Sequence, residues 1–506
     1  LRSHTDFAEY VRRQVPNATF SGTYLLDERT TLTGAANWMK RGGFRTYRQD
    51  DARYDPAGEV VSVARRFSQG HDPENDFDLS TRLTRKLARE GATVDIAMHR
   101  SVTHQHERYD YTNQSLVPAV PDSLTYLEFM EDRGLTELSA DYVRPLARNR
   151  ILKAGYAFER GDYGFGNWSG PYDAVAGVSV IDPVLSNAFR FRRDIQAGYV
   201  SLQAAWLGST WLTGLRAEST HHDALLLTDG SHSSQRDMQF FPSVHVDHPL
   251  SEETTLSFGA GRRIKRPEGG LYDPYINREY APNLTSGNPL LRPQITQSLE
   301  LGIEREHQGT MTQLTAYYRR NRGSVTDVVR YLPTGETLVT KDNLPRNDAA
   351  GVEFTLNGHV TSALSYQLSG NAFYSQIDAT LLGFAELRST TGVNLKSKMD
   401  VRLSAKDSLQ SSLVRTDRRL TPQGLVRAVN LFNASYRHVV SQDLAFIASV
   451  TDLFNGQRFF RETVGPDLTQ NYERRVAGRI IYAGFVYSVG SGKKERGPVL
   501  EEASGE

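Results

Sequence analysis

The sequence predicts an all-β protein, a transmembrane antiparallel β-barrel, from three observations. Apolar and polar residues alternate in nearly every segment, which is typical of strands with two different faces. Short polar turns alternate along the chain with long polar loops, as in barrels that gather turns at one end and loops at the other. One strand also carries several charges on one face, which a dry protein core would not accept.

The composition is compatible with a protein that crosses a membrane with strands. Hydrophobic residues make up 39% of the 506 residues, and the mean hydropathy is −0.49. No apolar run reaches the roughly 18 residues of a spanning helix, whereas a spanning strand needs only about 9–11 residues, half of them apolar. The 24 Tyr, 22 Phe and 41 Gly favour strands and turns. No change in composition marks the separate domains expected of a soluble chain this long.

Charge and cysteine content argue against other classes. The 59 basic and 59 acidic residues cancel, so the chain lacks the basic excess that nucleic-acid binding requires. There is no cysteine, which excludes disulfides and thiolate metal sites. We therefore expect no nucleic-acid partner.

One hairpin shows the plan of the predicted wall. In the strand over residues 295–304, Leu299, Leu301 and Ile303 point to one side, and Glu300 and Glu304 point to the other. We expect the apolar side to face lipid and the polar side to face the lumen. The segment 391–405 repeats this pattern with four charged residues on its polar side: Lys396, Lys398, Asp400 and Arg402.

About 19 strands are expected, joined alternately by short turns and long loops. The strands span residues 20–26, 32–41, 59–87, 94–109, 127–146, 151–163, 189–207, 211–224, 238–248, 256–265, 295–306, 311–320, 348–360, 364–376, 391–405, 409–417, 426–440, 444–454 and 475–489. The long loops span residues 40–58, 111–126, 164–188, 225–236, 266–292, 322–346, 377–388 and 455–473.

The barrel domain is expected over residues 18–490. Residues 1–17 are predicted to be an N-terminal loop or a partial segment. Residues 491–506 are rich in charged and small residues and are predicted to be a disordered tail. The chain starts without Met or an apolar leader, so we expect either a removed leader or a fragment.

Several short motifs follow one another in a characteristic order. They are Arg262-Arg263-Ile264-Lys265-Arg266-Pro267, Leu271–Tyr275, Gly287–Pro293, Leu299–Gly302, Tyr317–Arg320, Asp342-Asn343, Gly351–Phe354, Thr421–Gly424 and Val450–Asn455. In this order the chain resembles the barrel of TonB-dependent outer-membrane receptors. It is most similar to the subgroup described as the outer membrane protein β-barrel family. The resemblance covers residues 20–490.

The resemblance implies a receptor in the outer membrane of a Gram-negative bacterium, surrounded by outer-membrane lipid. Such a receptor takes up a scarce small-molecule solute, such as a metal chelate or an oligosaccharide, with energy from the TonB system. The plug domain and TonB box that accompany these barrels are not found in this sequence. Large plugged barrels have about 22 strands. About 19 strands would leave three before Phe20, making the chain part of a 22-stranded barrel.

Two other functions remain open. A passive pore, or a surface-binding barrel without energy coupling, would share the same strand pattern. An enzyme is not expected, because no nucleophile, base and orienting group form a recognisable arrangement. We also predict no cofactor. His104 and His106 share one side of a strand, but without a third ligand they do not predict a metal site.

The loop over residues 266–292 carries the candidate ligand contacts. These are Tyr272, Tyr275, Arg278 and Tyr280. Aromatic rings with an arginine at the mouth of a barrel are suited to a planar chelate or a sugar. The alternative is that the tyrosines anchor the loop on neighbouring strands. At the end of this loop, Pro289 and Pro293 bracket the entry to the next strand, which indicates a structural role in setting its register.

Overall fold

The structure, a computed structural model, describes residues 2–55, 57–147, 149–278, 283–333, 336–380, 387–464, 469–475 and 478–488. Strands dominate these ranges, which also contain the 3₁₀ helix η1 (Gly269–Tyr272). Within them, no helix has the length and apolar character needed to cross a membrane. The predicted all-β class is confirmed.

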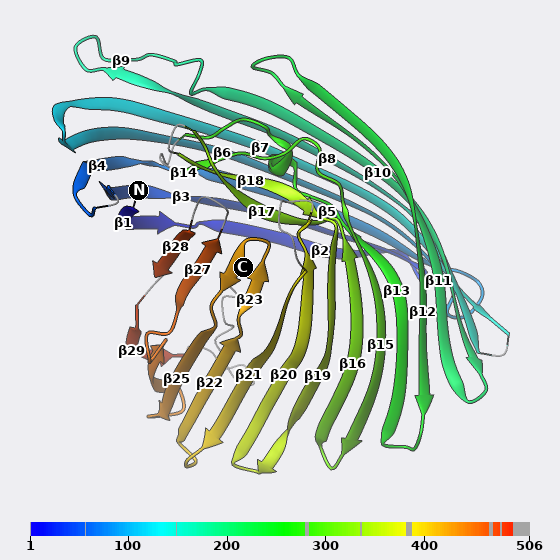
Figure 1. The fold of residues 1–506 in the computed structure, drawn as a ribbon. Coiled ribbons are helices and arrows are strands. Elements are labelled where there is room, and N and C mark those ends of the chain that lie inside the picture. Colours follow the sequence, from blue (N-terminus) through cyan, green and yellow to red (C-terminus); the bar gives the residue numbers. More distant parts are fainter. Residues whose placement is uncertain are drawn as a thin grey trace.

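An antiparallel sheet of 22 strands forms the curved wall of the barrel (Figure 1). The strands are β1 (Arg2–Gln14), β2 (Asn17–Asp27), β3 (Thr30–Tyr54), β4 (Val60–His71), β5 (Glu74–Lys86), β6 (Thr93–Val117), β7 (Ala119–Leu146), β8 (Arg150–Asp173), β9 (Val178–Ser179), β10 (Asn187–Trp206), β11 (Ser209–Leu226), β12 (His232–Pro249), β13 (Thr254–Lys265), β15 (Gln294–His307), β16 (Thr310–Arg322), β19 (Arg346–Thr361), β20 (Leu364–Asp378), β21 (Arg388–Arg402), β22 (Asp407–Thr416), β25 (Val429–Val439), β26 (Leu444–Thr451) and β29 (Ile480–Tyr487).

The wall has 19 strand positions because two long strands are each interrupted. β1 and β2 flank Pro16 and both pair with β3, while β4 and β5 flank Pro73 and pair with β3 and β6. Proline has no N–H with which to continue a ladder. Counting each interrupted pair once, and setting aside the two-residue β9, reduces the 22 strands to 19 positions. The expected number of about 19 is confirmed.

The N-terminal residues correct one prediction. Residues 1–17 were expected to form a loop or partial segment, but Arg2–Gln14 is strand β1 and pairs with residues 42–54 of β3. Polar residues occupy both faces of this strand, so its sequence lacks the alternation that marks a strand in lipid. The predicted disordered tail over residues 491–506 lies outside the described residues.

Three expected long loops are also mostly strand. β3 continues to Tyr54, β6 to Val117 and β8 to Asp173, so segments predicted as loops extend the wall instead. Water can reach both faces of a strand that projects beyond the bilayer, so hydrophobic alternation ends before the hydrogen-bonded ladder does. The longest strands of the wall are therefore β3, β6, β7 and β8.

The predicted sorting of turns and loops is confirmed, with short turns along the lower and right-hand side in Figure 1 and long connections at the opposite end. Leu207-Gly208 and Gln308-Gly309 each connect two strands with only two residues. All four have positive φ, between 49° and 74°, as a type I′ hairpin turn requires. This turn matches the twist of the flanking strands, so each hairpin reverses tightly.

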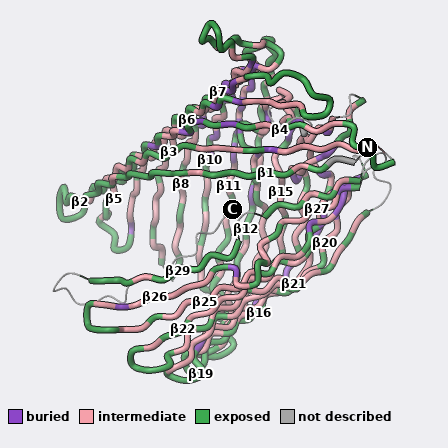
Figure 2. Tube along the Cα trace, turned by 90° about the vertical axis from the view of Figure 1, so that its left-hand side faces the viewer, coloured by how far each residue is buried: buried purple, intermediate pink, exposed green. Residues whose placement is uncertain are grey.

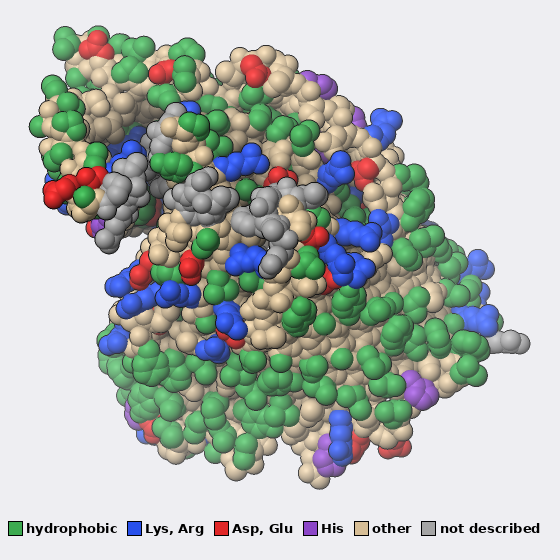
Figure 3. Space-filling model, viewed as in Figure 1, with side chains coloured by type: hydrophobic (Ala, Val, Ile, Leu, Met, Phe, Trp, Pro, Cys, Tyr) green, Lys and Arg blue, Asp and Glu red, His purple; other side chains and the backbone are tan. Residues whose placement is uncertain are grey.

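The two faces of the wall differ as the sequence predicts. Leu299, Leu301 and Ile303 are 51%, 52% and 40% exposed on the outer face of β15. On the opposite face, Arg319 lies 3.3 Å from Glu300 and 3.3 Å from Glu353. Figure 3 shows hydrophobic side chains gathered in a broad belt over the lower part of the wall, with charged side chains concentrated above it. This is the surface of a protein that stands in a bilayer.

The wall has two edges. Among the described residues, β29 pairs only with β26, and β1 and β2 pair only with β3. Figure 2 shows these edges separated. Both edges run toward the short-turn end, so direct pairing between them would be parallel, whereas the ladders of the wall are antiparallel. Three further strands between the edges would restore antiparallel pairing, and that number remains a prediction.

Strands from four long connections build two small sheets at the loop end, which together we call the canopy. The three-stranded sheet contains β14 (Asn283–Thr285), β18 (Thr337–Leu344) and β17 (Ser324–Tyr331). The four-stranded sheet contains β23 (Arg419–Thr421), β24 (Gly424–Val426), β27 (Arg458–Val464) and β28 (Thr469–Arg475). Residues far apart in the chain therefore meet above the lumen.

A buried glutamine joins the two canopy sheets. The side-chain oxygen of Gln423 accepts a hydrogen bond from the Val329 N–H at 2.6 Å, and its nitrogen donates to the Val329 carbonyl at 2.7 Å. Asp327 of β17 also pairs with Lys341 of β18 and lies 3.5 Å from Arg461 of β27. These contacts hold the two sheets of the canopy together.

The outer face of β15 gives a direct test of membrane placement. We expect Leu301→Lys to lower the free energy of folding into lipid vesicles by about 2 kcal/mol, because a charge then faces hydrocarbon. Glu304→Lys is the matched control, since it places the same charge on the lumen side. The heat-dependent electrophoretic shift of folded barrel measures both. Equal effects of the two substitutions would contradict the assignment of faces.

The canopy joint gives a second prediction. Gln423→Ala leaves a buried N–H and a buried carbonyl of Val329 without their side-chain partner, at a cost of about 1–3 kcal/mol. We expect faster amide exchange in β17 and faster proteolysis of the canopy, with the wall unchanged. Gln470→Ala on β28 is the control. Unchanged exchange in Gln423→Ala would show that the two sheets are held together by other contacts.

Candidate functional site

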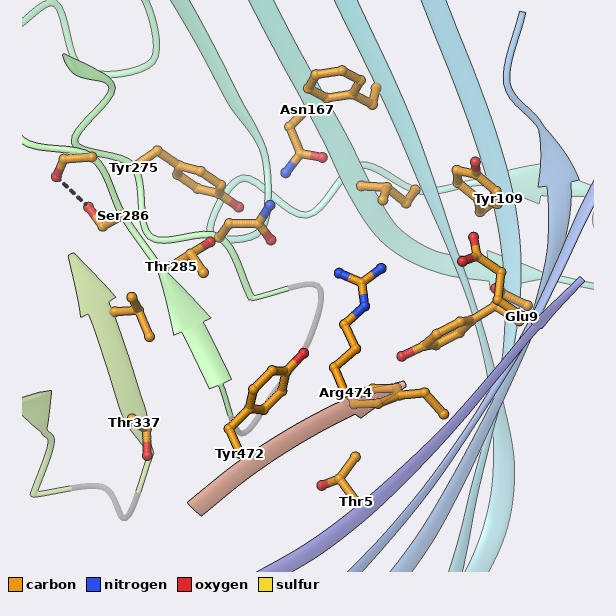
Figure 4. Close-up of a pocket in the computed structure, with 18 of the residues that line it drawn as sticks. Thr5, Glu9, Tyr109, Asn167, Tyr275, Thr285, Ser286, Thr337, Tyr472 and Arg474 are labelled. Carbon is orange, nitrogen blue, oxygen red and sulfur yellow. Dashed lines mark hydrogen bonds between the residues drawn. The ribbon is translucent and has the colours of Figure 1, made fainter. Parts of the chain in front are cut away.

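A cavity of about 2010 Å³ lies at the loop end between the wall and the canopy (Figure 4). We call it the mouth chamber. Strands β1, β3, β4, β6, β7 and β8 line it on the wall side, and β14, β18, β27 and β28 line it on the canopy side. Pockets for drug-sized molecules usually measure about 300–1,000 Å³. The chamber therefore has room for a larger solute.

Aromatic side chains from both sides line the mouth chamber. They are Phe7, Tyr47, Tyr109, Tyr111, Phe129, Phe165, Tyr275, Tyr331, Phe460 and Tyr472. In Figure 4, Tyr275 and Tyr472 extend into the cavity from the loop and from β28. Such side chains offer flat apolar faces together with hydroxyl groups. This lining suits a solute that has rings or flat surfaces and also hydrogen-bonding groups.

The loop between β13 and β15 folds inward against the wall. Its Tyr272 is only 3% exposed and stacks on Phe191 of β10, with ring centroids 4.8 Å apart and planes 15° from parallel. Phe189, Ala224 and Leu291 complete this buried cluster. Burial raises the pKa of Tyr272 to about 12. Tyr272 therefore acts in this structure as the anchor of the inward loop.

Asp273 follows Tyr272 in the chain, and its carboxylate is partly removed from water. Its carboxylate accepts hydrogen bonds from the Asn187 side chain at 2.9 Å and from the Tyr275 N–H at 3.0 Å. Burial nevertheless raises the pKa of Asp273 above its usual range, because the two donors only partly replace water. The carboxyl group lies in the lining of the mouth chamber and fixes the turn that carries Tyr275.

Asparagine side chains connect the motif Gly287–Pro293 with the segment around the motif Asp342-Asn343. Asn288 donates to the Lys341 carbonyl at 3.0 Å. Asn343 accepts from the Arg292 N–H at 2.8 Å and donates to the Arg292 and Gly323 carbonyls at 2.9 Å and 2.7 Å. A side chain on Gly287 would come within 2.4 Å of the Leu271 carbonyl oxygen. The Gly287–Pro293 motif is therefore structural and ties the inward loop to the canopy.

The four candidate ligand contacts have different surroundings. Tyr272 is buried in the cluster with Phe191, whereas Tyr275 lines the mouth chamber. Arg278 is half-buried and lies 3.3 Å from Glu336. Tyr280 lies outside the described residues. A role in ligand binding remains a prediction for these residues.

Several lining residues were not singled out from the sequence. Arg53, Tyr109 and Tyr111 come from strand ends that were expected to be loops or their borders, and Tyr472 and Arg474 come from the connection between β26 and β29. No local pattern marks them, because the chamber is assembled from segments more than 400 residues apart. The density of Tyr and Arg in the long connections was the only available signal.

His104 and His106 of β6 pair with carboxylates on the neighbouring strand β7. His104 lies 2.6 Å from Asp132, and His106 lies 2.7 Å from Glu128 of β7. Over the ranges that the structure describes, no group of three or more His, Cys, Asp or Glu side chains is arranged to hold a metal ion.

The sequence model of the Outer membrane protein beta-barrel family matches residues 85–487. The chain belongs to this family. It is an outer-membrane protein, and its short turns, by the usual arrangement of such barrels, face the periplasm. The canopy and the mouth chamber of this family member then face the outside of the cell.

Solved structures support the same fold. A chain of the FpvAI–pyocin S2 complex is 10% identical, with a TM-score of 0.57, over 96% of this chain and 72% of that chain. The ferric-catecholate import receptor Fiu from E. coli K12 is 10% identical, with a TM-score of 0.55, over 96% and 81%. The copper transporter OprC is 13% identical, with a TM-score of 0.54, over 95% and 80%. No curated protein sequence matches this family member.

The anchor of the inward loop gives a third prediction. Tyr272→Ala should destabilise the loop by about 3 kcal/mol, because it leaves a cavity beside Phe191. Amide exchange should then accelerate at Gly287 and Asn288, whose N–H groups donate to carbonyls of Asp273 and Leu271 at 2.8 Å and 2.7 Å. Tyr272→Phe keeps the ring and should retain the protection. Equal protection in the alanine variant would argue against an anchoring role.

Proposed function

We propose that this outer-membrane barrel captures a scarce solute in the mouth chamber and passes it inward through its lumen. The observation that supports capture is the chamber itself, a large cavity lined by aromatic side chains between the wall and the canopy built from four connections. A barrel that only conducts small solutes is better served by an unobstructed mouth. The joined canopy therefore favours a receptor over a passive pore.

Two kinds of solute suit the lining, a metal chelate and an oligosaccharide. Both present ring systems or flat faces to aromatic side chains, together with oxygen atoms for hydroxyl and guanidinium donors. Solute import also agrees with the names of two proteins that share the fold, a ferric-catecholate import receptor and a copper transporter. A role in transport is proposed in preference to catalysis.

Energy from the TonB system is part of the proposal on the strength of the motif resemblance. Movement of the solute inward would be driven through a plug domain within the polar lumen. The lumen side of β15, β16 and β19 supports such a neighbour, because it presents charged groups such as Glu300, Arg319 and Glu353. When a polar plug domain displaces water from this surface, its own polar groups would pair with these charged side chains, so no charge would be buried without a partner.

Transport by cells that express the gene tests the function. We expect saturable uptake of radiolabelled iron(III) catecholate or of labelled maltoheptaose, lost when TonB is deleted from the host. Saturation reports a binding site, and loss without TonB reports energy coupling. Uptake that rises linearly with concentration and is unchanged without TonB, with a steady conductance in planar bilayers, would instead support a passive pore.

A further inference from the structure

A buried histidine lies beneath the anchor of the inward loop. His222 of β11 is only 6% exposed. Its ring centroid lies 5.6 Å from that of Phe191 on β10 and 5.2 Å from that of Tyr272 in the loop. The Nε2 atom is buried and has no hydrogen-bond partner among the described residues. A neutral ring with its proton on Nδ1 fits this position, because it leaves no N–H donor stranded at Nε2.

The ring of His222 lies above the hydrocarbon layer of the membrane. His221 and Asp223, its neighbours in β11, point to the opposite, outer face, where they lie 3.0 Å apart. In register with them on β10 are Asp194 and Arg192. Charged side chains are unfavourable where the outer face meets hydrocarbon. This part of the wall is therefore in contact with the external medium, and its pH acts on the histidine.

A proton on His222 would be poorly accommodated. Burial is the main cause that holds the pKa of His222 below its usual range, and the positive charge of Arg193 is the next. His221 acts in the same direction, whereas Asp237 and Asp223 oppose the shift. The two flanking rings attract a cation, but the new N–H at Nε2 would have no acceptor among the described residues.

The base of the inward loop is attached to the wall beside the same ring. Arg193 of β10 donates to the Pro267 carbonyl at 3.1 Å. Arg266 lies 2.6 Å from Glu218 of β11. Together with the stacking of Tyr272, these contacts hold the loop against the wall. A positive charge on the histidine would repel Arg193 and favour water beneath Tyr272, so it would weaken two of the three attachments.

We propose that His222 is a proton-sensitive latch, which holds the inward loop against the wall when neutral and releases it when protonated. This inference goes beyond solute capture and does not depend on it. The loop carries Asp273 and Tyr275 into the lining of the mouth chamber. Acidification outside the cell would therefore change the shape of the chamber through a residue that does not line it.

The direction of the pH effect follows from the two states of the loop. In the released loop the histidine titrates near its ordinary pKa of about 6.5, whereas the pKa of His222 is lowered when the loop is docked. The released state therefore binds the proton more tightly. Docking is fully present above that pH and weakens as the pH falls. Burial raises the pKa of Asp273, so its protonation favours the docked loop and acts in the opposite direction.

Electron paramagnetic resonance on the 506-residue protein in lipid vesicles tests the latch. The chain has no cysteine, so Leu290→Cys carries a single nitroxide label at an exposed position next to the buried Leu291. We expect a mobile spectral component to grow as the pH falls from about 7.5 to about 5. The ratio of docked to released loop should fall by at most about tenfold per pH unit, the limit for one proton. The range stops there so that the Arg266–Glu218 ion pair keeps its charge.

Two substitutions remove the titrating group in different ways. His222→Phe keeps a ring and His222→Gln keeps a polar side chain, and we expect the docked spectrum of either variant to be independent of pH. His221→Gln is the matched control, since this neighbour points to the outer face, and it should retain the full response. The heat-dependent electrophoretic shift confirms that the barrel is folded at each pH. The same pH response in a His222 variant as in the parent would overturn the latch. Independently of the variants, so would an unchanged spectrum of the parent over this range.

Discussion

The hydrogen-bonding demand of the backbone in a lipid environment is the constraint on which this structure depends. Hydrocarbon offers no partner to an N–H or a carbonyl, so a chain without spanning helices must pair each strand with its neighbours. The antiparallel wall meets that demand throughout its 19 positions except at the outer sides of its two edges, where β29 and the strand formed by β1 and β2 have no further partner among the described residues. Side chains are then free to differ on the two faces. Leu299, Leu301 and Ile303 face outward on β15, while Glu300 takes part in an ion-pair chain on the lumen side.

Above the bilayer the same ladders serve another purpose. Strands such as β6 and β8 continue where both faces are wet, and their upper parts carry Tyr109, Tyr111 and Phe165 into the mouth chamber. A rigid wall thereby supplies one side of a binding site. The other side comes from four connections, which share backbone hydrogen bonds within the canopy and meet through Gln423. The chamber is therefore a feature of the whole barrel and of no single segment.

The inward loop shows how structural and binding roles divide between neighbouring residues. Tyr272 stacks on Phe191, and Asn288 and Asn343 connect the loop to the canopy, so these residues hold the loop in place. Tyr275 is three residues from Tyr272 and lines the chamber instead. A motif-rich segment thus owes most of its pattern to packing. Arg53 and Arg474 also line the chamber, and both lie outside every motif.

The sequence by itself determined the all-β class, the number of strand positions and the direction of each face, because alternation with a period of two follows from burial on one side only. It also determined which end carries the long connections. It did not reveal β1 or the upper parts of β3, β6 and β8, since a strand with water on both faces has no alternation to read. The pairing of four connections into a canopy, and the meeting of Arg53 with Arg474 at one cavity, depended on contacts between distant segments. Only the tertiary structure decides such contacts, because no local pattern of residues encodes them.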